Sequence, residues 1–157
     1  PEWIYTVLHG GPLDQFELPE FATVFDLTAI SADSRLTVDL VPRAGMFANP
    51  VPAPAQPGDE ALRRPARVAF LLASDPKNPL LSTYRLAVMD RDGSNLHLVF
   101  PPEGQPGLEP GSTPAWSPDG RLIAVLYRGN LWLIDPESGA SQQLTGDGLT
   151  THIQWGR

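Results

Sequence analysis

Short runs of hydrophobic residues, separated by turns rich in proline and glycine, make up most of this chain. The 157 residues include 18 prolines and 14 glycines, and no segment keeps an uninterrupted 3.6-residue apolar period. The runs are rich in Val, Ile, Leu and aromatic residues and have the length of β-strands. The pattern therefore predicts an all-β protein with ten strands: Trp3–Leu8, Thr23–Ile30, Leu36–Val41, Val68–Leu72, Tyr84–Met89, Leu96–Phe100, Leu122–Tyr127, Leu131–Ile134, Ser141–Leu144 and His152–Trp155.

Residues 42–66 have a composition that sets them apart from the rest of the chain. Six prolines fall in this stretch, mixed with alanine and glycine. Proline has a fixed φ and no N–H, so such a run favours an extended, polyproline-like backbone with few hydrogen bonds. We therefore expect residues 46–66 to form a linker or an exposed arm; Pro54–Pro57 has a PxxP spacing but no close basic residue, which favours a solvated spacer. The one weak helical candidate is Gly58–Arg64.

Residues 67–157 contain the same pattern twice. Tyr84–Asp90 matches Gly129–Asp135 at an offset of 45 residues, and Arg67–Leu72 matches Arg121–Leu126 at an offset of 54. The difference indicates a longer loop between two paired strands in the first copy. A repeat of about 40 residues with four strands in each copy is typical of a β-propeller blade.

The second copy opens with a turn whose residue types suit its backbone. In Trp116–Arg121, Pro118 presets φ at the second turn position and Gly120 supplies a positive φ. The run that follows lacks clean alternation, as expected for a strand that is covered on both faces. Another tryptophan, Trp155, follows Trp116 after 39 residues. We expect both rings to pack between blades, where burial contributes about 2 to 3 kcal/mol each.

Residues Pro114–Thr145 resemble the TolB-like, WD-type β-propeller repeat, and residues 67–113 resemble it more weakly. The resemblance implies two TolB-like blades over residues 67–157, after a Pro-rich linker or arm at 46–66. Residues 1–45 would then be a β-rich segment or a degenerate blade. A propeller needs at least four blades, so the chain would form a partial propeller. Its open edge would pair with another segment or with a second copy in a homo-oligomer.

The same resemblance implies a non-enzymatic function. TolB-like propellers are non-enzymatic protein–protein interaction modules of bacterial envelope or secreted proteins, which implies a protein partner and an extracytoplasmic location: periplasm, cell surface or medium. Two alternatives stay open. One is the gating propeller of a prolyl oligopeptidase-type serine peptidase whose catalytic domain lies outside this chain. The other is a propeller that binds a small ligand or calcium.

The charge and composition of the chain argue against several classes of partner. The formal net charge is −7, which argues against nucleic acid or an anionic membrane. No apolar run approaches the roughly 20 residues of a membrane helix, so we expect no membrane insertion. The absence of cysteine excludes disulfides, cysteine-ligated zinc and cysteine nucleophiles. The chain begins with Pro1 and ends near a repeat boundary, so we interpret it as a piece of a longer protein.

Candidate chemical groups are few, and each has a structural explanation. The histidines His9, His97 and His152 are too far apart for a local metal motif, and surface or strand positions are expected. Gly10-Gly11 lacks the lysine of a phosphate loop, and no Gly-x-Ser-x-Gly motif is present. Asp90–Asn95 has an Asp-x-Asp-Gly-x-Asn pattern that suits calcium, but a tight turn prefers the same residues. The sequence therefore predicts no catalytic residue, no metal site, no cofactor and no enzyme activity.

Overall fold

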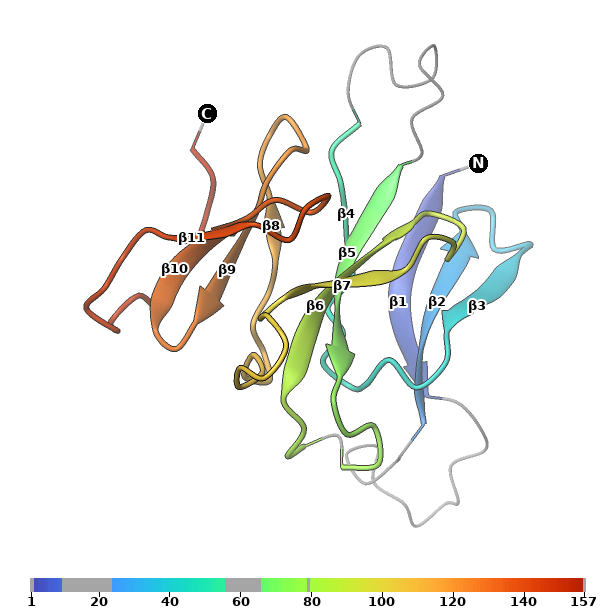
Figure 1. Cartoon of the computed structure of the whole chain (residues 1–157). Helices are drawn as coiled ribbons and strands as arrows, with labels where there is room; N and C mark the ends of the chain where they lie inside the picture. Colours follow the sequence, from blue (N-terminus) through green and yellow to red (C-terminus); the bar gives the residue numbers. More distant parts are fainter. Residues whose placement is uncertain (1, 10–23, 56–65, 79, 157) are drawn as a thin grey trace.

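The computed structural model describes residues 2–9, 24–55, 66–78 and 80–156, and the regular structure in these ranges is β-strand (Figure 1). The strands form three antiparallel sheets. Sheet A has the order β1-β2-β3, sheet B the order β4-β5-β6-β7 and sheet C the order β11-β10-β9-β8. The expected all-β class is confirmed. The strands are β1 (Trp3–His9), β2 (Phe25–Ser31), β3 (Thr37–Val41), β4 (Val51–Pro52), β5 (Arg67–Ala73), β6 (Tyr84–Asp90), β7 (His97–Phe100), β8 (Ala115–Trp116), β9 (Ile123–Tyr127), β10 (Asn130–Ile134) and β11 (Ser141–Gln143).

Most of the expected runs lie on strands, with ends that differ by one or two residues. The exception is His152–Trp155, which belongs to no strand in the described part of the chain. Two strands of only two residues, β4 and β8, were not among the ten expected runs. The helical candidate Gly58–Arg64 and the pair Gly10-Gly11 lie outside the described residues.

Sheet B lies between sheets A and C, and an apolar cluster fills each junction (Figure 1). Leu27 and Val41 of sheet A pack in one cluster with Val68 and Phe70 of sheet B. On the other face of sheet B, Leu71 and its neighbours pack against sheet C. Residues next to each other on a strand point to opposite faces, so residues 68–71 of β5 are all buried because both faces of the strand are covered. The second cluster contains Ala69, Leu71, Ala73, Tyr84, Leu86, Val88, Val99, Phe100, Leu108, Trp116, Ile123, Val125, Tyr127 and Ile134.

Residues 44–53 lie along β5, where we expected a linker or an exposed arm. Ala44 and Ala48 are fully buried, and their carbonyl oxygens accept the N–H groups of Ala73 and Leu71 at 2.8 and 2.6 Å. The proline-rich composition is compatible with this because β4 is an edge strand of sheet B, where a residue without an N–H removes no ladder bond. The expectation of a linker is therefore wrong for residues 46–53, and residues 56–65 lie outside the described ranges.

The turn between β2 and β3, Ser31–Leu36, repeats the main hydrogen bonds of the Ser117–Leu122 turn. In each turn the first serine donates its hydroxyl to the aspartate two residues later, at 2.6 Å. The same hydroxyl oxygen accepts the N–H of the leucine five residues later, at 3.0 and 2.9 Å. The fourth position has a positive φ in both turns, 57° at Ser34 and 65° at Gly120. The N-terminal segment thus contains a second copy of this turn.

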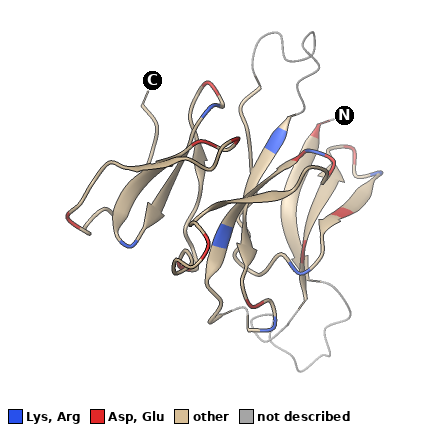
Figure 2. Cartoon of the chain, viewed as in Figure 1, with Lys and Arg blue, Asp and Glu red and all other residues tan. Residues whose placement is uncertain are grey.

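Charged side chains lie mainly at the turns (Figure 2). In both serine turns, the hydroxyl and the backbone N–H donate to the aspartate, and they hold the pKa of Asp33 and of Asp119 below its usual value. Two basic residues, Arg67 and Arg85, lie instead within strands of sheet B. Arg67 is the first residue of β5, and its side chain contacts Glu137 and Gly120 in turns of sheet C.

Candidate functional site

The junctions between successive sheets hold the most specific polar contacts of the described residues. The first is a tryptophan bond that occurs twice. Trp116 donates its indole N–H to the carbonyl oxygen of Val51 at 3.0 Å, and Trp155 donates in the same way to Ala115 at 3.0 Å. Val51 and Ala115 hold the same place in their sheets, because each lies on the first strand and pairs with an alanine of the second. Segment 151–156 therefore meets sheet C as β8 meets sheet B.

A second contact also recurs from one junction to the next. Gly93, in the turn between β6 and β7, lies against Leu40 of β3; a Cβ added there would lie 3.4 Å from the Leu40 side chain. Gly139, in the turn between β10 and β11, lies against Val99 of β7; a Cβ there would lie 3.4 Å from the Val99 carbonyl oxygen. Both glycines have a positive φ, of 86° and 70°. In sheets B and C, a turn that contains a glycine thus packs against the outer strand of the preceding sheet.

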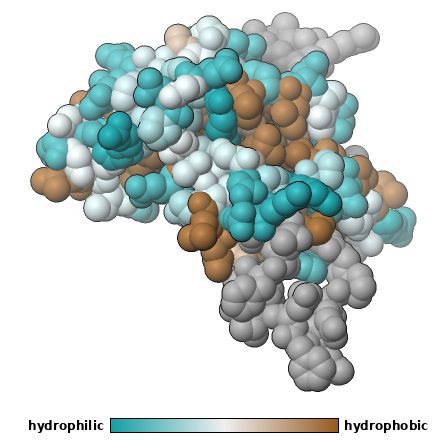
Figure 3. Space-filling view, turned by 60° about the horizontal axis from the view of Figure 1, so that its bottom comes forward, coloured by the Kyte–Doolittle hydropathy of each residue, from teal (hydrophilic) through white to brown (hydrophobic). Residues whose placement is uncertain are grey.

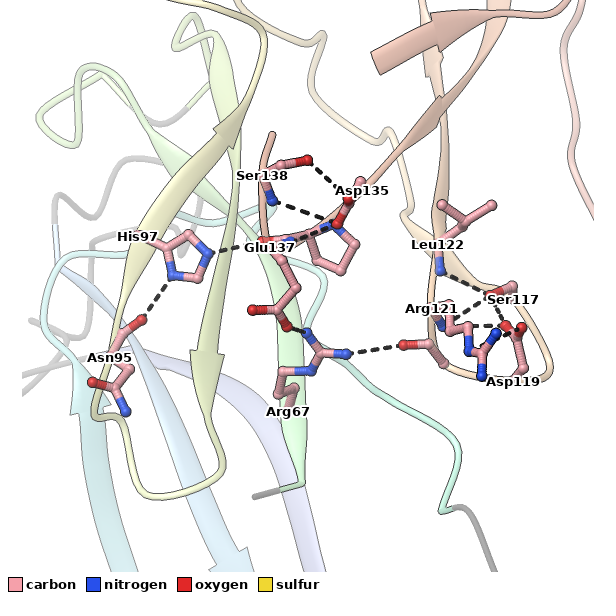
Figure 4. Close-up of polar contacts among 12 residues, drawn as sticks. Arg67, Asn95, His97, Ser117, Asp119, Arg121, Leu122, Asp135, Glu137 and Ser138 are labelled. Atoms are coloured by element: carbon pink, nitrogen blue, oxygen red, sulfur yellow. Dashed lines mark hydrogen bonds and ion pairs between the residues drawn. The ribbon is translucent and has the colours of Figure 1, made fainter. Parts of the chain in front are cut away.

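Arg67 joins sheet B to two turns of sheet C (Figure 4). Its guanidinium donates to the carboxylate of Glu137 and to the carbonyl oxygen of Gly120, the latter at 3.0 Å. It also lies over the ring of Trp116, 5.2 Å from the centroid. The Arg67 side chain is 24% exposed and that of Glu137 is 77% exposed. Most of the stabilisation therefore comes from the ring and the carbonyl, because an exposed ion pair contributes little.

His97 connects the same two sheets from the other side of Glu137 (Figure 4). Its Nδ1 lies 2.8 Å from the carbonyl oxygen of Asn95, and its Nε2 lies 2.9 Å from that of Pro136. A neutral imidazole can donate to only one of these acceptors, whereas the imidazolium donates to both. These two carbonyl groups raise the pKa of His97 above its usual value, and Glu137 adds to the effect while burial and Arg67 oppose it. His97 is a junction residue.

The remaining candidate groups form no shared site among the residues the structure describes. His9 packs edge-to-face with Phe25, with ring centroids 5.7 Å apart, and His152 is exposed and lies outside the strands. Across the described ranges, no three His, Cys, Asp or Glu side chains gather in a group that could hold a metal ion.

The turn Asp90–Asn95 uses its carboxylates to hold itself together. Asn95 donates its side-chain amide to Asp90 Oδ2 at 2.6 Å, and Ser94 donates its hydroxyl to Asp92 Oδ1 at 2.6 Å. The bonds from Ser94 lower the pKa of Asp92. The same arrangement occurs in the next sheet, where Asp135 accepts from the turn that follows it and has a lowered pKa. In both turns, the aspartate carboxylates therefore stabilise the turn itself.

A groove with aromatic walls opens beside the junction of sheets B and C. Its volume is about 620 Å³, and Phe100, Tyr127 and Trp132 line it together with Gln105, Arg128, Ser141 and Gln143. We call it the aromatic groove. The Phe100 ring lies 5.1 Å from that of Tyr127 and 5.4 Å from that of Trp132. None of these residues is a candidate from the sequence alone, because the groove forms only where strands of two sheets meet.

No protein-family model matches the chain, and no curated protein matches it either. Over the described residues, no helix has the length and apolar character that crossing a bilayer requires.

Proposed function

We propose that this chain is a non-catalytic protein–protein interaction module, built from repeated β-propeller-like units and acting outside the cytoplasm of a bacterium. The observation that carries the proposal is the tryptophan bond that occurs twice. Trp116 and Trp155 donate to equivalent carbonyl groups in successive sheets. A contact that recurs at equivalent positions supports a stack of like units, which is how repeat proteins build extended binding surfaces. The resemblance of Pro114–Thr145 to TolB-like repeats supports the class of function and the location.

The geometry of the sheets also supports a role in binding. The strands β3, β7 and β11 each lie at an edge of their sheet, and an edge strand offers backbone groups to a partner. On the face in Figure 3, hydrophobic residues gather in one area right of the centre, and smaller hydrophobic areas lie apart from it among hydrophilic residues. Leu81 and Leu149, 87% and 76% exposed, lie in different parts of the fold. Strand edges are candidate surfaces because they offer backbone groups to a partner as well as side chains.

Affinity capture tests this proposal. The immobilised chain is exposed separately to envelope, secreted and cytoplasmic fractions of the source organism, and retained proteins are identified by mass spectrometry. An unrelated all-β protein of similar net charge serves as the control. We expect a protein from the envelope or secreted fraction that, once purified, binds the chain with a defined stoichiometry. A partner found only in the cytoplasmic fraction contradicts the location, and the absence of any purified partner contradicts the function.

A further inference from the structure

The outer edge of sheet C presents backbone groups that the sheet does not use. At the two ends of the β10–β11 ladder, Asp135 donates its N–H to Ala140 and Leu144 donates its N–H to Leu131, both at 2.8 Å. In an antiparallel pair, residues alternate between those bonded to the partner strand and those that point away from it. Ser141 and Gln143 are therefore the residues of β11 whose N–H and C=O point outward, and β11 is exposed along its length.

The aromatic groove lies on one face of this edge. Gln143 pairs with Trp132 and Ser141 pairs with Ile134, so the side chains of Ser141 and Gln143 share the face that carries the Trp132 ring. An extended peptide added beside β11 would continue sheet C. Alternate side chains of that peptide would point to the same face, next to the rings of Trp132 and its neighbours. The volume of about 620 Å³ is within the usual range for binding pockets.

Arg128 supplies the charge of the groove. It is exposed in the turn between β9 and β10, and it is the one charged residue among the described residues that line the groove. Within the described part of the chain, Arg35, Arg67 and Arg121 form ion pairs, whereas Arg128 forms none. An unpaired guanidinium beside aromatic rings is suited to a carboxylate, which it can bind through two parallel hydrogen bonds.

We propose that sheet C binds an extended acidic peptide of a protein partner by strand addition to β11. The peptide backbone pairs with the outward groups of Ser141 and Gln143. One apolar side chain of the peptide packs on the rings of the aromatic groove, and one Asp or Glu carboxylate binds Arg128. Strand addition of this kind takes affinity from the backbone and specificity from alternate side chains. The inference rests on the proposed interaction function and names its surface and the chemistry of its partner.

A peptide library tests the inference on the full chain. Random nine-residue peptides are enriched on the immobilised protein, and the enriched sequences are synthesised and measured by fluorescence anisotropy. We expect enrichment of peptides with an Asp or Glu near an apolar residue. Arg128→Asn should weaken their binding at least tenfold, because asparagine tolerates the positive φ of 53° at this position but carries no charge. Arg35→Asn, a change at an exposed arginine of sheet A, is the matched control and should leave the affinity unchanged.

A second variant separates strand addition from a simple charge effect. Gln143→Pro removes an outward N–H but no bond of the β10–β11 ladder, since proline is tolerated on an edge strand. It should also weaken binding at least tenfold, while near-UV circular dichroism and the melting temperature show that the fold is kept. Enrichment of neutral or basic peptides, affinities that neither variant changes, or no enrichment at all would overturn the inference. The protein capture described above uses no peptide, so each proposal can fail separately.

Discussion

Trp155 donates its indole N–H to the carbonyl oxygen of Ala115 at 3.0 Å, and so repeats beyond sheet C the bond that joins sheet C to sheet B. The residues that carry it are 39 positions apart in the sequence and have different surroundings, since Trp116 is 5% exposed and Trp155 is half-buried. The bond therefore depends on how successive units meet and not on how deeply the tryptophan ring is buried.

Removal of the indole N–H at Trp116 should weaken the junction of sheets B and C. Trp116→Phe keeps an aromatic ring but leaves the Val51 carbonyl oxygen without this donor, and we expect a loss of about 1 to 3 kcal/mol in the free energy of unfolding. Trp116→Ala also creates a cavity and should cost about 3 to 5 kcal/mol. Urea unfolding followed by circular dichroism measures both. Equal stability of Trp116→Phe and the wild type would show that the bond contributes nothing.

The two residues of the Arg67–Glu137 ion pair should contribute unequally to the free energy of unfolding. Arg67→Met removes the bond to Gly120 and the contact with the Trp116 ring, so we expect a loss of about 1 to 2 kcal/mol. Glu137→Gln affects an exposed carboxylate and should stay within about 0.5 kcal/mol of the wild type. The same unfolding experiment compares them. If Glu137→Gln costs as much as Arg67→Met, the ion pair dominates this junction.

His97 should make the stability depend on pH. Its pKa in the folded protein is raised by the carbonyl groups of Asn95 and Pro136, so the folded state binds a proton more tightly than the unfolded state does. The resulting stabilisation is complete below the unfolded pKa of about 6.5 and is lost as the pH rises through the raised pKa of the folded protein. The melting temperature of the wild type should therefore fall relative to that of His97→Asn between mildly acidic and alkaline pH. A constant difference between the two proteins would contradict this role.

The two serine turns should contribute equally to stability. Ser31→Ala and Ser117→Ala each remove a buried hydroxyl that makes the same two bonds, and we expect each to cost about 1 to 2 kcal/mol. Chemical denaturation of the single variants and of the double variant checks the values and their sum. A neutral Ser31→Ala would mean that the turn of sheet A only looks like that of sheet C.

Calcium should not stabilise the protein. The carboxylates of Asp90 and Asp92 accept bonds from Asn95 and Ser94 within their own turn, so a calcium ion would have to displace these bonds. We expect an unchanged melting temperature in millimolar calcium and in chelator, and no heat in titration calorimetry. A calcium-dependent rise in melting temperature that Asp92→Asn abolishes would restore the calcium alternative.

Local pattern predicted most of the strands because hydrophobic runs and turn residues largely determine where these strands begin and end. It predicted residues 46–53 wrongly, since proline density was interpreted without the knowledge that β4 is an edge strand. The Ser31–Leu36 turn was missed because Ser34 replaces the glycine that marks the turn at Gly120. Both errors arise where a residue type that is unusual for a conformation is accepted by its surroundings.

The junction contacts and the aromatic groove lie beyond what a local pattern can predict. Phe100 and Trp132 are far apart along the chain and meet because sheet C packs on sheet B. His97 was expected at a surface or strand position, and it does lie exposed on β7, but its bond to Pro136 depends on the position of a turn in the next sheet. Such contacts follow from the stacking of sheets, which no single segment encodes.

Sheet B alone has an apolar cluster on each face among the described sheets. Its backbone amides in β5 and β6 can reach water only when a neighbouring sheet separates or the whole fold opens. Their hydrogen exchange should then be the slowest in the molecule and report the global free energy of unfolding, whereas amides near the edges of sheets A and C exchange through smaller, local openings. The middle sheet would act as the foldon on which the outer two assemble, so damage to sheet A or C would leave a compact remnant, but damage to sheet B would not.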